Sequence, residues 1–553
     1  MFFANDALAK VVADRTQVPT APARETDSFE SDGEPILEAG EIQGDILPGF
    51  TTKHQAFIGV RFLPAGLKQG KAVLAALLPN ISSFKQLFGF RSLRRDLRRT
   101  GEAEASHLPA VGFNIAFSID GLRMLGAKVD GIRDAAFVNG MHSRSDDVLG
   151  DPSNATDPGH RSKWITGGSA QDTPHAFLIF ASDDAAFLRK IWTATQEQIK
   201  LSRAFEPRLY REEGHVLPGE IEHFGFRDGI SQPGVRGRVS GQGLATRRLI
   251  DDSDPRSATF AAPGRPLVWP GNYIFGYPTQ LPADPLTPGP VSDGGQPWMR
   301  NGSFLVFRRL KQNVQAFRDF FRKLAASFSA VPPLSQMTVE QRMEWLAARA
   351  VGRWPSGAPV MRHPDKDAPE AGADSIESNH FQYRDETTEV LVEGRHLKGC
   401  PADYLGQNCP MWAHIRKVNP RDIDTDKDVG EATRGFQMLR GGIPFGPLFD
   451  ENPAAERGLL FVSFQSSIPG HFELLTHDWM NTFTAPQGNG FDLLVGQNNA
   501  LPRAADLSLP SQTVSITVES PFIVPSGGGY FFAPSITTLR HLLVGKRKKL
   551  QEK

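Results

Sequence analysis

The chain has few of the residues that stabilise small secreted domains or anchor a protein in a bilayer. Only two of its 553 residues are cysteines, Cys400 and Cys409, so a framework of disulfide bonds is excluded. No run of about 18 apolar residues occurs, which argues against a transmembrane helix. Residues 1–6 lack the basic and apolar regions of a secretory signal peptide. We therefore expect a cytoplasmic protein that does not associate with membranes.

An excess of charge of one sign is also missing. Lys and Arg number 61 against 62 for Asp and Glu, and this formal net charge of −1 argues against a dedicated nucleic-acid-binding protein. Hydrophobic residues make up 40% and charged residues 22% of the chain, as in an ordinary globular protein rather than a disordered or fibrous one. A chain of this length supports a large hydrophobic core divided between at least two domains.

Three common catalytic motifs are absent from the sequence: the phosphate-binding Gly-x-x-x-x-Gly-Lys-Ser/Thr loop, the His-Glu-x-x-His zinc helix and the Gly-x-Ser-x-Gly elbow of hydrolases. A structural zinc site is an alternative, because His396, Cys400, Cys409 and His414 share one short segment. Structural zinc ligands usually come in pairs about two to four residues apart. Cys400 and Cys409 are separated more widely than that, which disfavours zinc.

Short apolar runs that alternate with helical patterns predict an α+β fold. Strands are expected at residues 56–62, 112–117, 175–181, 273–276, 303–307, 459–464 and 530–532. Helices are expected at residues 121–125, 183–201 and 313–324, the second capped by Asp183 or Asp184. The runs are too short for a large parallel sheet, and the pattern recurs along the chain. We therefore expect two similar α+β halves of the ferredoxin type.

The composition predicts four segments. Residues 1–40 are polar and typical of a flexible arm. Residues 41–240 and 241–545 are expected to form N-terminal and C-terminal ferredoxin-like domains, and residues 546–553 a solvated basic tail. Pro- and Gly-rich stretches between residues 238 and 300 are expected to form the linker and long surface loops.

Three short segments carry residues that are candidates for chemistry. Residues 225–233 (GFRDGISQP) hold Asp228 between glycines, where a sharp turn can project a carboxylate into a cavity. Residues 409–421 contain His414, and further on Arg440 precedes two glycines. Taken singly, these are more commonly a turn, a hydrogen-bonded histidine and a surface loop. Their occurrence together and in this order is what points to a function.

With these segments in this order, the chain resembles the dye-decolourising peroxidases, a family of haem peroxidases that carries a Gly-x-x-Asp-Gly signature, here residues 225–229. Further matching stretches are residues 43–47 (QGDIL), 303–309 and 352–359. The resemblance runs from about Gln43 to Ile536, and the length is most like that of the longer bacterial and fungal members. It implies two ferredoxin-like domains of the dimeric α+β barrel superfamily, with the signature in the N-terminal domain and haem in the C-terminal half.

The resemblance also implies haem b, iron protoporphyrin IX, as the cofactor. His414 would be the axial ligand of the iron, and Asp492 would accept a hydrogen bond from the other ring nitrogen, which fixes the tautomer and raises the basicity of the ligand. Arg416 and Arg353 are expected to pair with the haem propionates, because a guanidinium fork suits a carboxylate. Both arginines are equally open to interpretation as ordinary surface ion pairs.

On the opposite side of the haem, the resemblance implies that Asp228 moves a proton of hydrogen peroxide from one oxygen to the other, while Arg440 stabilises the charge on the departing oxygen. Leu459 and Phe461 would form the apolar ceiling, or simply be core residues of a strand. The electron donors implied are anthraquinone and azo dyes, phenols and other aromatic compounds. Because aspartate ordinarily titrates at about pH 4 and histidine at about pH 6.5, an acidic pH optimum is expected.

Bulky dyes cannot reach a buried haem, so electrons are expected to pass between dye and haem through redox-active surface side chains. Some relatives carry a tyrosine five residues after the catalytic arginine, whereas Phe445 stands at that position here. Trp479 is an alternative candidate for electron transfer, although a packed core tryptophan is the more common arrangement.

Two other functions stay open at this point. A haem carrier or sensor would need neither Asp228 nor Arg440, and a structural protein that had lost the cofactor would not need His414. Members of the family often form dimers or larger assemblies, so a homodimer is one candidate assembly.

Overall fold

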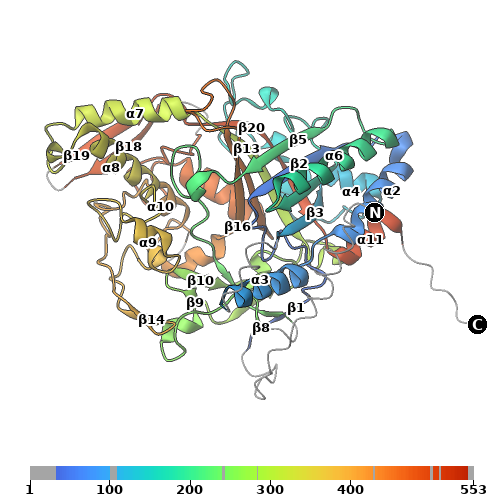
Figure 1. Ribbon diagram of the computed structural model, residues 1–553, viewed down its shortest axis with the longest axis horizontal. Coiled ribbons are helices and arrows are strands. Elements are labelled where there is room, and N and C mark those ends of the chain that lie inside the picture. The colour runs from blue at the N-terminus through green and yellow to red at the C-terminus, as the bar shows by residue number, and fades with distance from the viewer. Residues whose placement is uncertain are drawn as a thin grey trace, which may run out of the picture.

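The structure, a computed structural model, describes residues 33–99, 109–239, 243–282, 284–427, 430–497, 502–509 and 512–545 (Figure 1). The predicted basic tail and residues 1–32 of the predicted arm lie outside these described residues. No helix within them is long and apolar enough to cross a membrane.

One eight-stranded antiparallel sheet runs through both halves of the chain, in the order β16-β17-β13-β20-β3-β4-β2-β5. The N-terminal half supplies β2 (His54–Val60), β3 (Val111–Phe117), β4 (Ala176–Ser182) and β5 (Tyr210–His215). The C-terminal half supplies β13 (Ser303–Gln312), β16 (Leu439–Phe445), β17 (Gly458–Gln465) and β20 (Ile523–Ala533). Within each half the fourth strand lies beside the first, then come the third and the second, which is the ferredoxin-like arrangement. The predicted pair of ferredoxin-like halves is therefore confirmed.

The two halves meet where β20 pairs with β3 through Phe532 and Phe117. At the opposite ends of the sheet, β5 and β16 also come close, because a Cβ atom added at Gly214 would lie 2.5 Å from the side chain of Ile443. No strand ladder joins β5 to β16 within the described residues, so the sheet curls into a barrel that stays open. The predicted boundary at residue 240 falls in the connection between β5 and β13 and stays a prediction.

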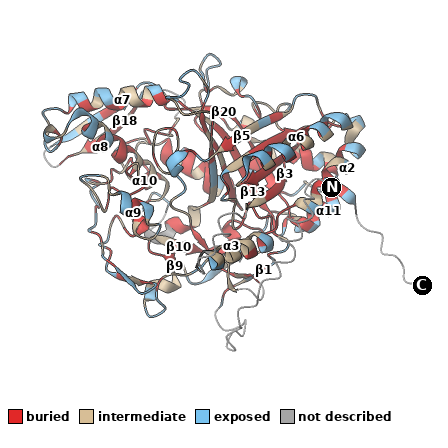
Figure 2. Ribbon diagram, viewed as in Figure 1, coloured by how far each residue is buried: buried red, intermediate tan, exposed pale blue. Residues whose placement is uncertain are grey.

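Helices and small sheets surround this barrel. The helices are α2 (Leu67–Leu77), α3 (Phe84–Arg99), α4 (Ile119–Leu125), α5 (Ala135–Asn139), α6 (Ala185–Ser202), α7 (Val314–Ser327), α8 (Val339–Val351), α9 (Pro369–Ala373), α10 (His414–Val418), α11 (Ile536–Val544) and the π-type helix η13 (Pro469–Met480). The short strands are β1 (Ile36–Leu37), β6 (Gly234–Val235), β7 (Arg238–Val239), β8 (Gly243–Leu244), β9 (Phe260–Ala262), β10 (Arg265–Val268), β11 (Pro278–Gln280), β12 (Pro288–Val291), β14 (Val390–Val392), β15 (Arg395–Leu397), β18 (Arg503–Ser508) and β19 (Thr513–Val518). Figure 2 shows the central strands buried and the outer faces of helices such as α3 and α7 exposed.

Both faces of the sheet are apolar, and the alternation of side chains along each strand assigns them to different cores. On β4, Phe177 faces the barrel interior, where its ring centroid lies 4.7 Å from that of Phe307 and 4.9 Å from that of Phe531. Leu178 and Phe180 face the other way, toward the core beneath the covering helices. The strands are therefore held between two packed layers rather than exposed on one side.

Most of the predicted elements are confirmed, and their ends have identifiable causes. Helix α6 begins where the Asp184 carboxylate accepts hydrogen bonds from the backbone of Ala186 and Phe187, as the sequence predicted. Helix α7 begins where Asn313 accepts from the backbone of Ala316. Local side-chain capping is readable from sequence because it needs no distant partner.

Two predictions are wrong. Residues 273–276 are not a strand: the backbone amides of Tyr273 and Ile274 donate to the carbonyl of Pro270, and this turn is buried in the barrel core. An apolar run signals burial but not the conformation in which it is buried. Residues 33–40 are not part of a flexible arm, since β1 pairs in parallel with β7 and the buried Glu34 forms an ion pair with Arg236 at 3.0 Å.

The aromatic packing inside the barrel generates a prediction for stability. Phe177→Ala should lower the free energy of unfolding by about 3–5 kcal/mol, because it leaves a cavity among rings contributed by both halves. Leu201→Ala is the matched control, since Leu201 is 82% exposed and its loss should change stability by no more than about 0.5 kcal/mol. Urea unfolding followed by circular dichroism measures both. Equal midpoints for the two variants would contradict the assignment of this core.

Candidate active site

A cavity of about 310 Å³ lies against the outer face of the C-terminal half of the sheet. Leu459 and Phe461 of β17 line it, while the intervening Leu460 points into the barrel interior. Helix η13 lines it with Phe472 and Leu475. Asp228, His414, Arg440 and Arg353 also line this cavity, so four of the candidate residues from distant parts of the sequence share one space.

The half-buried His414 and the buried Asp492 form a hydrogen-bonded pair at one wall. His414 is the first residue of α10, and its Nδ1 lies 2.7 Å from Oδ2 of Asp492. Asp492 is fully buried, and its Oδ1 accepts hydrogen bonds from the backbone amides of Leu494 and Val495, both at 3.0 Å. Burial opposes the charged carboxylate, but His414 and the two amides outweigh it and hold the pKa of Asp492 below its usual value. Because Asp492 contacts Nδ1, the other ring nitrogen of His414, Nε2, has no bond to this carboxylate.

The Asp228 turn is built by its glycines. Gly225 and Gly229 have φ angles of +99° and +73°, in the left-handed region that glycine adopts without steric cost. Asp228 itself is exposed at the cavity, and its Oδ1 accepts a hydrogen bond of 2.6 Å from the amide of Gly229. This local geometry is the physical reason for the Gly-x-x-Asp-Gly spacing.

Arg440 is tied to the same turn from β16. Its Nη2 donates to the carbonyl of Ser231 at 2.7 Å. The Gln232 side chain bonds to the backbone of Arg440 on both sides, donating to its carbonyl at 2.7 Å and accepting from its amide at 3.2 Å. These bonds hold the turn that carries Asp228 next to Arg440, although about 200 residues separate the two in the sequence.

A second carboxyl group, Glu222, lines the cavity and was missed by the sequence analysis. Its oxygens accept hydrogen bonds from the amides of Phe224 at 2.9 Å and Phe226 at 3.0 Å, and from the side chain of Gln312. Burial raises the pKa of Glu222 to about 7 against the effect of these bonds, and the charge of Asp228 adds to the rise. No local sequence pattern distinguishes this glutamate from an exposed one.

Arginines without acidic partners lie along another wall. Arg353 donates only to the carbonyls of Gly357 and Ser378 and to Asn379, and burial lowers its pKa to about 9. Arg421, also missed by the sequence analysis, donates to backbone carbonyls. Within the described residues neither Arg353, Arg421 nor Arg440 forms an ion pair. Positive charge gathered without carboxylates suits a ligand that brings acidic groups of its own.

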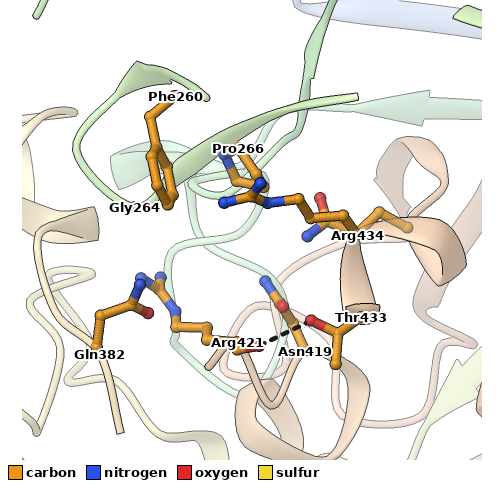
Figure 3. Close-up of a pocket in the computed structure, with 9 residues that line it drawn as sticks. Phe260, Gly264, Pro266, Gln382, Asn419, Arg421, Thr433 and Arg434 are labelled. Atoms are coloured by element: carbon orange, nitrogen blue, oxygen red, sulfur yellow. Dashed lines mark hydrogen bonds between the residues drawn. The ribbon is translucent and has the colours of Figure 1, made fainter. Parts of the chain in front are cut away.

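A much smaller hollow of about 20 Å³ adjoins this arginine wall (Figure 3). It shares Asn419, Arg421, Gln437 and Pro266 with the main cavity. The Arg421 guanidinium lies 3.6 Å from the centre of the Phe381 ring, and its backbone carbonyl accepts a hydrogen bond from the Thr433 hydroxyl at 2.9 Å. Arg421 is therefore held in place from two sides.

The expectation that Arg416 contacts a propionate is wrong. Arg416 is fully buried and does not line the cavity. It donates to the carbonyls of Asp403 at 2.9 Å and Cys409 at 2.8 Å, and to the side chain of Gln487 at 2.9 Å. Two residues apart on a helix do not share a face, so Arg416 points away from the side that His414 presents.

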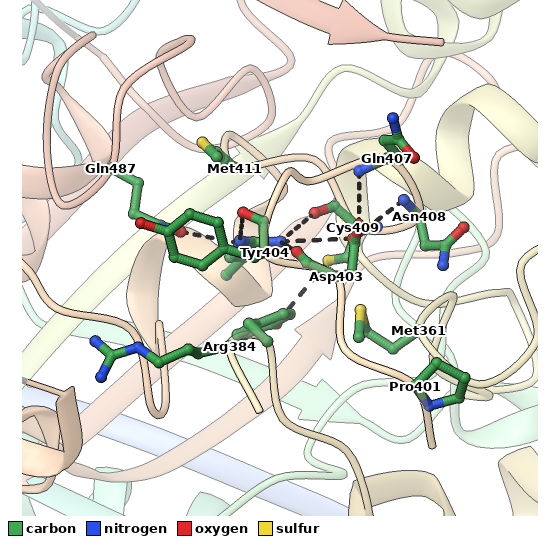
Figure 4. A network of polar contacts seen from close by, with 12 residues as sticks. Met361, Arg384, Pro401, Asp403, Tyr404, Gln407, Asn408, Cys409, Met411 and Gln487 are labelled. Carbon is green, nitrogen blue, oxygen red and sulfur yellow. Dashed lines mark hydrogen bonds and ion pairs between the residues drawn. The ribbon is translucent and has the colours of Figure 1, made fainter. Parts of the chain in front are cut away.

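Arg416 instead belongs to a polar network that fixes the loop before His414. Figure 4 shows Asp403 of this network beside Gln407, Asn408 and Cys409. The Asp403 carboxylate accepts the backbone amides of Gln407, Asn408 and Cys409 at 2.7–3.0 Å. Because the same loop runs directly into α10, these bonds determine where His414 begins its helix.

Trp479 does not line the cavity, but its helix does. The residue is fully buried on η13, between the cavity-lining Thr476 and Met480. Its indole nitrogen donates to the Asp426 carboxylate at 2.9 Å. Trp479 is thus a core residue whose indole N–H donates to a carboxylate.

Comparisons with known proteins agree with this arrangement. A family model described as a DyP dimeric alpha+beta barrel domain matches residues 41–218. The dye-decolorizing peroxidase of Exidia glandulosa is 31% identical over 553 residues, covering 96% of this chain and 91% of that protein. The dye-decolorizing peroxidase msp1 of Mycetinis scorodonius is 29% identical and covers 92% of this chain and 88% of its own length.

Solved structures give the same result. An ancestral D-type dye-decolorizing peroxidase aligns with a TM-score of 0.71 at 29% identity, over 92% of this chain and 99% of that one. A dye-decolorizing peroxidase in complex with 2,6-dimethoxyphenol aligns with a TM-score of 0.68 at 28% identity, over 92% of this chain and all of its own. With a sequence relative above 30% identity that is covered almost completely, the chain belongs to the dye-decolourising peroxidase family.

Proposed function

We propose that this protein is a haem b peroxidase that reduces hydrogen peroxide and oxidises dyes, phenols and other aromatic donors in one-electron steps, fastest at acidic pH. The observation that carries the proposal is the convergence of Asp228, Arg440 and His414 on one cavity. Relatives over nearly the whole chain are named dye-decolorizing peroxidases, and a structural neighbour is titled as a complex with a phenol. A carrier or sensor would need neither Asp228 nor Arg440. The description of the matched domain as dimeric supports a homodimer.

The residues of the cavity fit haem. His414 offers an imidazole nitrogen, Leu459 and Phe461 offer an apolar wall, and Arg353 and Arg421 are cations without acidic partners that suit two propionates. When bound, haem supplies the iron centre that reduces peroxide and then oxidises the donors. Asp492 holds the Nδ1 proton of His414, so Nε2 is the nitrogen available as a ligand.

Glu222 and Asp228 have different tasks because their environments differ. Glu222 is half-buried, and its pKa of about 7 keeps it protonated and neutral in acidic solution. Asp228 is exposed at the cavity and accepts one short hydrogen bond from its own loop. Asp228 therefore takes the proton from one oxygen of hydrogen peroxide and returns it to the other, which leaves as water. Arg440 stabilises the negative charge on the leaving oxygen.

Replacing the acid–base residue tests this mechanism. Asp228→Asn should slow the reaction with hydrogen peroxide by about 10²–10⁴-fold, because the amide cannot accept the proton. Haem binding should be unchanged, since His414 and Asp492 are untouched. Stopped-flow absorbance in the Soret region measures both, and Asp252→Asn, a change at an exposed site, is the control. Normal peroxide reactivity in Asp228→Asn would remove the assignment.

The pH dependence should follow the ionisation of Glu222. We expect dye oxidation to be fastest below pH 7 and to fall as Glu222 loses its proton near pH 7, because a second negative charge then opposes the charge that develops on the leaving oxygen. Glu222→Gln, which stays neutral, should extend activity to higher pH. Steady-state rates between pH 3 and pH 9 measure this, and a wild-type maximum above pH 7 would contradict it.

Trp479 is proposed as a buried relay through which electrons from donors too bulky to enter the cavity pass inward to the oxidised haem. Trp479→Phe should slow oxidation of an anthraquinone dye by about tenfold or more while leaving the peroxide reaction and the oxidation of a small phenol unchanged, because only the indole and its bond to Asp426 are lost. Trp298→Phe is the matched control, since the Trp298 indole donates to a backbone carbonyl and does not line the cavity. Equal dye oxidation by both variants would exclude Trp479.

A further inference from the structure

A tyrosine, a glutamate and an arginine form a buried chain beside the cavity. Tyr530 on β20 is 2% exposed, and its hydroxyl donates to Oε1 of Glu473 at 2.9 Å. Glu473 on η13 is 3% exposed. Its two carboxylate oxygens accept hydrogen bonds from Nε and Nη2 of Arg144, at 2.5 Å and 2.6 Å. Arg144 compensates the negative charge of the carboxylate, so Glu473 can accept a proton without being an isolated buried anion.

This chain lies one aromatic ring away from the cavity. Phe472 lines the cavity and directly precedes Glu473 in the sequence. Its ring centroid is 6.3 Å from that of Tyr530, in an edge-to-face arrangement, and 6.1 Å from that of Phe461, which also lines the cavity. The Tyr530 phenol is therefore close to the reacting space but shielded from any donor in solution.

The other five tyrosines lack this environment. The hydroxyls of Tyr210 and Tyr273 are buried with no hydrogen-bond partner among the described residues. Tyr277 donates to the amide oxygen of Asn301, and the Tyr383 hydroxyl accepts from the Cys409 thiol at 3.9 Å. Tyr404 is 57% exposed. Tyr530 is the tyrosine whose hydroxyl donates to a carboxylate within the described part of the chain.

The chemistry of a phenol makes this difference important. A phenol that loses an electron becomes a strong acid, so oxidation inside a protein is practicable only where the proton has an acceptor. Burial and the neighbouring carboxylate both raise the pKa of Tyr530 well above its usual value, which keeps the resting phenol protonated. The hydrogen bond to Glu473 supplies the acceptor at the moment of oxidation.

We propose that Tyr530 is an internal one-electron donor of this peroxidase, with Glu473 as its proton acceptor. The proposal rests on the peroxidase function above, which supplies the oxidant. After hydrogen peroxide is reduced and while no external donor is bound, one electron passes from Tyr530 to the oxidised haem centre. The O–H bond of Tyr530 breaks, its proton forms an O–H bond on Glu473, and a neutral phenoxyl radical remains. An electron from an external donor later reduces the radical, and Glu473 returns the proton.

Freeze-quench electron paramagnetic resonance of the haem-loaded protein tests the proposal. One equivalent of hydrogen peroxide without donor should give a radical signal that narrows when the protein contains ring-deuterated tyrosine. The signal should be lost in Tyr530→Phe, which removes one hydroxyl and keeps the ring packed. It should persist in Tyr273→Phe and Tyr210→Phe, the matched buried controls. Glu473→Gln should slow the appearance of the radical by about a hundredfold, because the acceptor is gone.

The Soret spectrum recorded on the same samples separates the two possible failures. A normal change on addition of peroxide, together with an unaltered tyrosine signal in Tyr530→Phe, would overturn the role of Tyr530 and leave the peroxidase function intact. No spectral change with peroxide in the wild-type protein would overturn the proposed function and the internal donor with it. Equal melting temperatures of the wild type and Tyr530→Phe show that a lost signal does not reflect misfolding.

Discussion

The carboxylate of Asp492 carries a charge in a place that water does not reach, and the site is arranged around the bonds that this charge requires. Two backbone amides and the His414 ring satisfy it. On the same side of α10, the buried amine of Lys417 donates to the carbonyl of Thr482 at 2.6 Å. Burial lowers the pKa of Lys417 to about 8, while Asp492 opposes that shift. A charge inside a protein is stable only when such partners are fixed, so the helix that carries His414 is fixed as well.

The sheet divides the work between its two faces. Aromatic rings from both halves fill the interior of the open barrel, and their packing holds the two halves together. The outer face of the C-terminal half carries the cavity, where the same strands present Leu459, Phe461 and Arg308. Because side chains alternate along a strand, one sequence can specify a packed core and a cavity wall with neighbouring residues. The cavity can therefore occupy one face of the sheet without interrupting the packing on the other face.

Different neighbours give similar residues different properties in and around this cavity. Glu222 and Asp228 line the same space, but Glu222 is half-buried and accepts hydrogen bonds from two backbone amides, whereas Asp228 is exposed at the cavity. Tyr530 and Tyr273 are both buried, but only the first meets a carboxylate. Arg353 and Arg416 are both buried guanidiniums, and only Arg353 reaches the cavity. In each pair the residue type limits the reactions that are possible, and the neighbouring groups decide which of them the side chain can carry out.

The sequence by itself determined what depends on short spans of chain. The glycines beside Asp228, the caps of α6 and α7 and the alternating strands were all readable, because turns, caps and pleats are set by adjacent residues. His414, Arg440 and Asp492 were singled out by the family resemblance and not by a local pattern. The tertiary structure alone decided which distant residues share the cavity. It brought in Glu222 and Arg421, turned Arg416 away, bent residues 273–276 into a turn, and ordered residues 33–40 against β7. Those outcomes depend on contacts between segments far apart in the chain, and no local pattern encodes the direction in which a side chain meets them.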